Sequence, residues 1–206
     1  MSNKFPLSQK YIDFINTTNV SAEFLEGTTA SGKTTVGAGV KFMRMVSQSP
    51  KKLHAIAAKT TGKAEETIIQ QDNGILDLHR NAVYCGNGDK DYKLPHIKFE
   101  GKIIYILGYS SRDKWEMVLG AQFGCVYIDE INTADIEFIR EMSTRNDYML
   151  ATLNPDDPSL PVYRSLSTAP VLLKNMKTMF LPRLRRSLPK NLYRIGGIGS
   201  FLLPII

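Results

Sequence analysis

The residues most able to do chemistry form a phosphate-binding sequence near the start of the chain. They fit the pattern GxxxxGK[ST] without a mismatch and read Gly27, Thr28, Thr29, Ala30, Ser31, Gly32, Lys33 and Thr34. Glycines let backbone N–H groups turn toward a phosphate, and the N-terminus of a following helix adds its positive dipole end. Lys33 is long enough to contact the terminal phosphates, and the Thr34 hydroxyl is a suitable ligand for Mg²⁺. The pattern therefore predicts a nucleotide site.

Two adjacent carboxylates, Asp129 and Glu130, follow the apolar segment 123–128. This arrangement has the Walker B pattern. Asp129 would hold Mg²⁺ through its waters, because this ion keeps most of its hydration shell. Glu130 would orient and deprotonate an attacking water. An acidic pair also fits a helix-capping turn, but together with a phosphate loop it indicates ATP hydrolysis. The second carboxylate favours an ATPase over a kinase, and the chain has no guanine-reading NKxD sequence.

Three further polar residues are weaker candidates. Thr152 and Asn154 close the next apolar segment, where they could sense loss of the γ-phosphate and pass the signal to a mobile element; Asn154-Pro155 is also an ordinary turn signal. Gln9 could hydrogen-bond an adenine edge, and solvent exposure is an equally good account of it.

Apolar segments with strand character alternate with segments of helical periodicity. The predicted strands are 22–26, 53–58, a hairpin over 96–107 that turns at Glu100-Gly101, 123–128 and 148–152. The predicted helices are 8–15, 35–46, 114–121 and 133–142, and 64–78 is predicted to be mostly helical. This alternation predicts a three-layer α/β fold around a mostly parallel central sheet.

Length and composition fit one soluble α/β domain followed by a basic tail. The chain has 206 residues and a formal net charge of +6. From Arg164 onward it carries eight Lys or Arg and no Asp or Glu, so positions 1–163 are slightly acidic. The overall basicity is therefore a poor argument for DNA binding. Two cysteines without a CxxC spacing, and no membrane-length apolar run, favour a reducing cytoplasm.

Three segments taken together resemble the large terminase subunit of tailed bacteriophages, and most closely the branch of phages and prophages of Gram-positive bacteria. They are Glu26–Thr35, Tyr127–Asn132 and Ala151–Pro158, and their order and spacing match the packaging ATPase domain. The resemblance implies an ASCE-type, RecA-like P-loop ATPase. It also implies that the protein forms a ring on the capsid portal, works with a small terminase subunit and pumps double-stranded DNA into the prohead.

The resemblance assigns roles to individual residues. Phosphate and metal binding fall to Lys33, Thr34 and the neighbouring loop residues up to Thr35. Asp129 becomes the metal carboxylate, Glu130 the activator of water, and Thr152 with Asn154 the coupling motif. Gln9 falls at the adenine-reading position.

Two features depart from the family pattern. The arginine that many large terminases place just before the Walker B strand is missing, and Arg112, further upstream, is the candidate arginine finger; an exposed charge at a helix start is the simpler account. No acidic residue follows Asp157, so the metal site of the family's nuclease domain is not expected. We expect an ATPase domain over 1–163 and a poorly ordered, unrelated tail over 164–206, and we hypothesise a frameshifted or decayed prophage gene.

Two other interpretations stay open at the sequence level. One is an inactive prophage remnant that binds nucleotide but drives nothing. The other is a different P-loop enzyme such as a helicase-like motor or a small-molecule kinase; the acidic pair disfavours the kinase, and a helicase needs a second motor domain.

Overall fold

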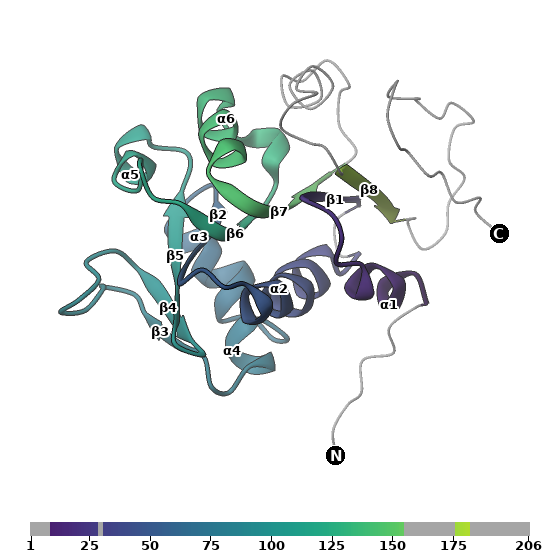
Figure 1. Ribbon diagram of the computed structural model, residues 1–206, viewed down its shortest axis with the longest axis horizontal. Helices are drawn as coiled ribbons and strands as arrows, with labels where there is room; N and C mark the ends of the chain where they lie inside the picture. Colours follow the sequence, from purple (N-terminus) through teal and green to yellow (C-terminus); the bar gives the residue numbers. More distant parts are fainter. Residues whose placement is uncertain (1–8, 29–30, 155–175, 182–206) are drawn as a thin grey trace.

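The computed structural model describes residues 9–28, 31–154 and 176–181, and its centre is an eight-stranded sheet (Figure 1). The strand order is β3-β4-β5-β2-β6-β7-β1-β8. The strands are β1 (Ala22–Gly27), β2 (Leu53–Ala58), β3 (Val83–Cys85), β4 (His96–Phe99), β5 (Lys102–Gly108), β6 (Phe123–Ile128), β7 (Asn146–Leu153) and β8 (Met176–Leu181). In the sheet, neighbouring strands run parallel from β5 through β2, β6, β7 and β1 to β8. β4 pairs antiparallel with both β3 and β5.

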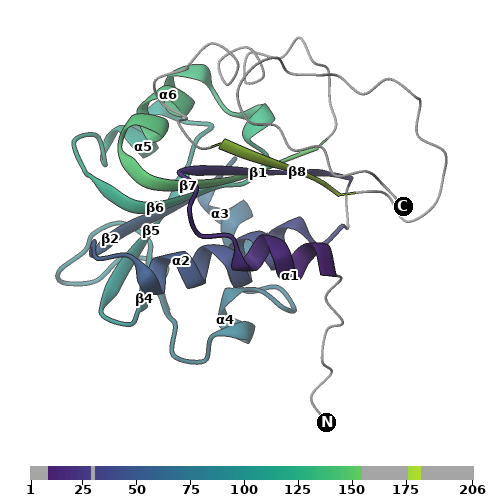
Figure 2. The ribbon, with the colours of Figure 1, turned by 45° about the vertical axis from the view of Figure 1, so that its right-hand side comes forward.

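Helices cover both faces of this sheet, as Figure 2 shows edge-on. One face carries α1 (Gln9–Asn16), the helix formed by η1 (Thr35–Phe42) and α2 (Met43–Gln48), then α3 (Thr61–Ala64), η2 (Glu65–Ile69) and α4 (Ile75–Leu78). The other carries α5 (Arg112–Glu116), η3 (Ile131–Thr133) and α6 (Ile136–Thr144). Each face has its own apolar core, which Phe42 and Tyr127 exemplify on the first and Phe138 and Val126 on the second. The predicted three-layer α/β fold is confirmed.

Local sequence patterns located the strands better than the helices. All five predicted strand segments form strands, and the hairpin turns at Glu100 and Gly101, both with positive φ. The helix predicted over 35–46 is present but is π-helical through Phe42. Those predicted over 114–121 and 133–142 are shifted and shorter, because the chain turns at Gly120 and winds as a 3₁₀ turn at 131–133.

The segment 64–78, which is predicted to be mostly helical, is helical in two parts and not as one element. It is broken between Ile69 and Ile75, where Asn73 has a φ of 60°. The next residue, Gly74, has no room for a side chain, since a Cβ there would lie 2.8–2.9 Å from the carbonyl oxygens of Gln71, Ile68 and Ile69. An Asn-Gly pair is a turn signal, and here it outweighs the apolar periodicity on both sides.

Gly74→Ala is expected to destabilise the fold by about 1–3 kcal/mol, because the added methyl group must displace packed backbone. Gly62→Ala is the matched control: nothing lies within 4 Å of a Cβ at Gly62, which sits in α3. That change should be neutral or stabilising by up to about 1 kcal/mol. Chemical denaturation of both variants measures the difference in the free energy of unfolding. Equal stabilities would show that the backbone of the turn shifts to accommodate the methyl group at little cost.

The basic tail contributes one described element. Met176–Leu181 forms β8, which pairs parallel with β1 at the edge of the sheet. No strand was expected there, because the sequence shows no sustained alternation. The division predicted at residue 163 lies outside the described residues.

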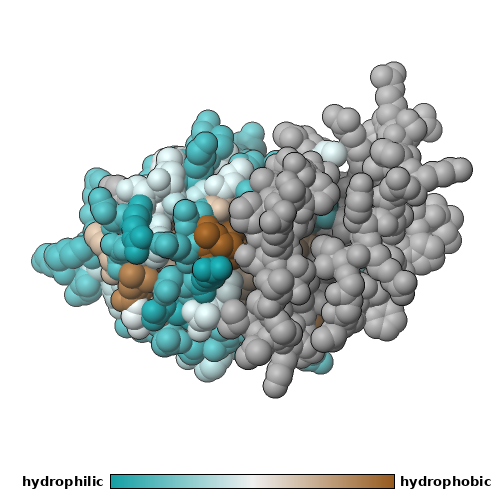
Figure 3. Space-filling view, turned by 90° about the horizontal axis from the view of Figure 1, so that it is seen from above, coloured by the Kyte–Doolittle hydropathy of each residue, from teal (hydrophilic) through white to brown (hydrophobic). Residues whose placement is uncertain are grey.

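Exposed large apolar side chains are few on the described part of the chain. The face in Figure 3 is mainly hydrophilic with isolated apolar side chains. The large apolar residues exposed on the described part of the chain are Ile12, Leu78 and Val83 on three different elements, and Met117 and Leu119 in the turn after α5. Within that part, no helix is both long and apolar enough to cross a membrane.

Candidate functional site

A polar hollow of about 240 Å³ lies where β1, β6 and β7 end. It is lined by Ser31, Gly32, Lys33, Thr34, Thr35, Gln71, Asp129, Glu130, Thr152 and Asn154. β7 lies between β6 and β1, with Ile128 opposite Ala151 and Leu25 opposite Thr152. This register brings three segments that are distant in sequence to one edge of the sheet. Carboxyl ends of parallel strands are the usual ligand-binding position in such folds.

Lys33 lies in the hollow and is held by backbone oxygens. Its ammonium group donates to the carbonyl of Gly27, to that of Thr28 at 2.8 Å and to Asn154 Oδ1 at 3.1 Å. Burial lowers the pKa of Lys33, an effect that the negative charges of Asp129, Glu130 and Glu26 oppose. The Asn154 contact directly joins the predicted phosphate loop to the predicted coupling segment. An arriving phosphate would offer the same ammonium a charged acceptor in place of these neutral ones.

The Asp129 carboxylate is oriented by two hydroxyl groups. Oδ1 accepts from Thr152 Oγ1 at 2.7 Å and from the Tyr127 hydroxyl at 3.0 Å. Thr152 is 1% exposed, so its hydroxyl is fixed by its surroundings. Burial raises the pKa of Tyr127 well above its usual value, and the neighbouring Asp129 carboxylate adds to the shift.

Glu130 adopts a left-handed backbone conformation, with φ 49° and ψ 49°. For a residue other than glycine this conformation is strained, and several hydrogen bonds hold it. Its N–H donates to Thr152 Oγ1 at 3.0 Å. Its carbonyl accepts from the backbone N–H of Thr133 at 2.9 Å, from the Thr133 hydroxyl at 3.0 Å and from the Tyr109 hydroxyl at 3.3 Å. The single hydroxyl of Thr152 thus contacts both residues of the acidic pair.

Three contributing residues were not predicted from the sequence. The Tyr11 hydroxyl on α1 donates to the carbonyl of Ser31 and so anchors the phosphate-binding loop to α1. Gln71 lines the hollow from the turn after η2. Tyr109 follows the end of β5, and that position at the carboxyl edge of the sheet is a signal that could have identified it.

Two predicted residues are placed apart from the hollow, and two lie outside the described chain. Gln9 is exposed on α1, where it donates to Asp13 Oδ1 at 2.8 Å. Arg112 is 64% exposed and forms ion pairs with Glu116 and, at 2.7 Å, with Glu137. Neither is among the described residues that line the hollow. Thr29 and Ala30 belong to the predicted loop and fall in the undescribed gap.

The fold of this chain is similar to that of a phage protein whose structure has been solved. The large terminase from a thermophilic bacteriophage matches with a TM-score of 0.66 and 17% identity, over 85% of this chain and 46% of that one. The same terminase in complex with ADP matches with 18% identity and a TM-score of 0.66, and its complex with ATP-γ-S with 16% and 0.65; each match covers 85% of this chain and 45% of that one. The chain thus spans less than half the length of these relatives.

Sequence comparison identifies the family directly. No curated protein sequence matches the chain. The family model described as "Terminase large subunit, T4likevirus-type, N-terminal" matches residues 24–159, about two thirds of the chain. The matched region contains the phosphate loop, the acidic pair and the Thr152–Asn154 segment that line the hollow. The chain therefore belongs to the terminase large subunit family, of which it contains the N-terminal ATPase region.

Proposed function

We propose that this chain binds and hydrolyses Mg²⁺-ATP at the hollow, and that hydrolysis drives double-stranded DNA into a phage procapsid. The observation that carries the proposal is the contact of the Thr152 hydroxyl with both Asp129 and Glu130, while Asn154 of the same segment contacts Lys33. A change in the acceptors of Lys33 on phosphate binding or loss would thus be transmitted to Asp129 and Glu130 through residues 152–154. Family membership supplies the DNA-packaging context.

Each residue has a distinct task in this proposal. The phosphate-binding loop residues Gly27–Thr35 surround the phosphates, and Lys33 exchanges its backbone acceptors for phosphate oxygens. Thr34 and Asp129 fit the oxygen ligands that Mg²⁺ prefers, and the bound ion would neutralise phosphate charge. Glu130 accepts the proton of the attacking water. Loss of the γ-phosphate frees the Lys33 ammonium to return to Asn154.

The proposed assembly is a ring of copies on a portal protein, supplied with DNA by a small terminase subunit. Arg112 is the proposed arginine finger for a neighbouring copy, because its exposure leaves it free to cross an interface. To act in this way it must leave Glu116 and Glu137, whose exposed ion pairs are weak. Gln9 remains the proposed adenine contact, which requires it to leave Asp13. The proposed ATPase unit is residues 1–163, and the tail 164–206 adds the edge strand β8 to its sheet.

The proposal is tested by steady-state ATP hydrolysis by the full chain, with and without double-stranded DNA, beside direct ATP binding. We expect turnover that DNA stimulates and that Lys33→Ala abolishes. Lys10→Ala is the matched control, since that lysine lies on α1 and does not line the hollow. If the wild type binds ATP but hydrolyses no more than Lys33→Ala, the chain is a nucleotide-binding remnant and the enzyme proposal fails.

Thr152→Val is expected to lower kcat by about 10- to 100-fold, the usual cost of removing a group that orients a metal or catalytic ligand. Valine keeps the shape of the buried side chain but removes both hydrogen bonds of the hydroxyl. Thr152→Ser keeps them and should retain most activity. At saturating Mg²⁺, KM for ATP should change less than kcat, because the hydroxyl contacts the acidic pair and not the phosphate loop. A Thr152→Val enzyme as fast as Thr152→Ser would show that the contact does not orient Glu130.

A further inference from the structure

A second group of ligating side chains lies at the opposite end of the sheet from β1. Cys85 on β3 pairs directly with His96 on β4, and Asp89 lies in the loop that joins these strands. One ligand atom from each of the three residues lies within 4.8 Å of the other two. Thiolate, imidazole and carboxylate are the side chains that bind Zn²⁺ in proteins. None of the three takes part in the proposed ATPase site.

His96 presents one ring nitrogen to this group. The side chain is completely buried, and Nδ1 lies 2.8 Å from the carbonyl of Leu94, to which it donates. Nε2 is therefore the nitrogen left for a metal; it is buried and has no hydrogen-bond partner. It lies 3.3 Å from Asp89 Oδ2. A buried nitrogen without a partner is costly, and a metal-binding histidine usually donates its other nitrogen to such a carbonyl.

The Asp89 carboxylate is held in place by its own loop. Oδ1 accepts from the backbone N–H groups of Asp91 at 2.9 Å and Tyr92 at 2.8 Å, which directs Oδ2 toward His96. The Lys98 ammonium also contacts Oδ2, and this contact lowers the pKa of Asp89. Lys98 is 44% exposed, so it can swing into solvent at small cost. The carboxylate is therefore oriented before any metal arrives.

We propose that Cys85, Asp89 and His96 bind one Zn²⁺ ion, with water as the fourth ligand. Two ligands about 2 Å from Zn²⁺ at the tetrahedral angle lie about 3.3 Å apart, which is the observed spacing of His96 Nε2 and Asp89 Oδ2. On binding, the Cys85 thiol releases its proton to solvent and Lys98 leaves Oδ2. The ion closes the loop between β3 and β4 and stabilises this edge of the sheet.

The test uses the full chain, freed of metal with a chelator and titrated with Co²⁺ in excess Mg²⁺. Co²⁺ bound by a thiolate has a charge-transfer absorption that carboxylate sites lack. We expect this absorption to saturate at one Co²⁺ per chain and to disappear when Zn²⁺ is added. Absence of a saturable absorption would overturn the proposal and leave Asp89, His96 and Lys98 as an ion-pair cluster only.

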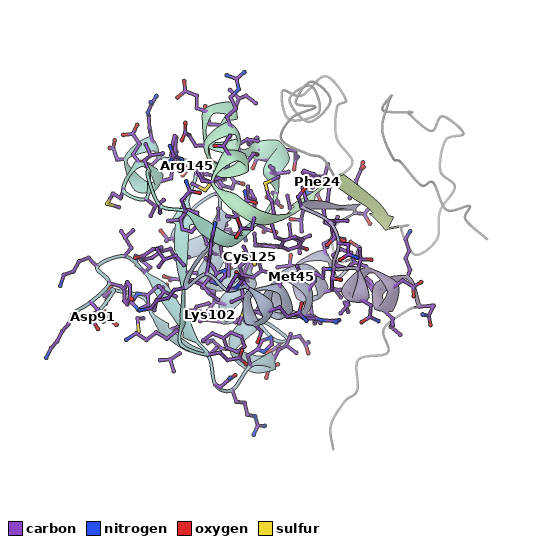
Figure 4. The ribbon with its side chains drawn as sticks, viewed as in Figure 1. Phe24, Met45, Asp91, Lys102, Cys125 and Arg145 are labelled. Atoms are coloured by element: carbon purple, nitrogen blue, oxygen red, sulfur yellow. The ribbon has the colours of Figure 1, made fainter. Side chains whose placement is uncertain are left out.

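Matched variants locate the ion. Cys85→Ser should abolish the absorption, whereas Cys125→Ala should keep it, since Cys125 lies in the centre of the molecule (Figure 4). His96→Gln should weaken Zn²⁺ binding at least about tenfold. Asp91→Asn, in the same loop but at its outer end (Figure 4), should bind as the wild type does. Lys98→Gln should bind as tightly or more tightly. An absorption that survives Cys85→Ser, or binding unchanged in His96→Gln, overturns the assignment.

Discussion

Replacing Glu130 by glutamine is expected to lower the turnover number for ATP by about 10²–10⁴-fold, the usual contribution of a general base. Glutamine preserves the size of the side chain and leaves intact the backbone contacts that hold the left-handed turn. It cannot accept a proton at neutral pH. ATP affinity should therefore stay within about threefold, since a loss confined to the transition state lowers kcat without raising KM. Single-turnover hydrolysis and equilibrium ATP binding measure the two quantities separately.

Glu137→Gln is the control for that change. It removes the same charge from α6, where Glu137 is exposed and pairs with Arg112. It should leave single-turnover hydrolysis by isolated chains unaltered. Should Glu130→Gln retain more than about half of the wild-type rate, the base would be another group in the hollow, and Asp129 would be the next residue to change.

The sequence predicted the parts of the site that depend on local pattern. The spacing of Gly27, Gly32 and Lys33 encodes the phosphate loop by itself, and six consecutive buried residues before Asp129 mark β6 as a central strand. A parallel central strand is buried on both faces, so its sequence is apolar throughout. Because neighbouring parallel strands end at the same edge of a sheet, Thr152 at the end of the next strand was expected near the acidic pair.

The remaining contacts join residues far apart in the chain, and no local pattern specifies them. Tyr11 and Ser31 are 20 positions apart, and Lys33 and Asn154 are 121 apart. Which side chain fills such a contact depends on the register between strands and on the docking of α1, both of which are tertiary. Tyr109 shows the same difficulty: the pattern located β5 but not the direction of the hydroxyl that follows it.

Another long-range contact is buried between β1 and the phosphate-loop helix, which is the helix formed by η1 and α2. It joins Lys41 on that helix to Glu23 on β1. Lys41 Nζ lies 3.2 Å from Glu23 Oε2, and the two side chains are 0% and 1% exposed. The ammonium also donates to the carbonyl of Phe14 at 2.8 Å and to that of Thr17, at the C-terminal end of α1. Tyr148 on β7 donates to the same carboxylate oxygen at 2.7 Å. The pair therefore joins α1, the phosphate-loop helix, β1 and β7.

Lys41→Met is expected to destabilise the fold by about 3–5 kcal/mol, because it leaves the Glu23 carboxylate buried without its cation. For a chain of this size the melting temperature should fall by roughly 6–20 °C. Lys63→Met removes an exposed pair with Glu66 and should cost no more than about 1 kcal/mol. Adding Glu23→Gln to Lys41→Met should restore much of the loss, since an uncharged amide still accepts from Tyr148. Chemical denaturation of the three variants decides the cause: a double variant no more stable than Lys41→Met would assign the loss to packing around α1 and not to the unpaired charge.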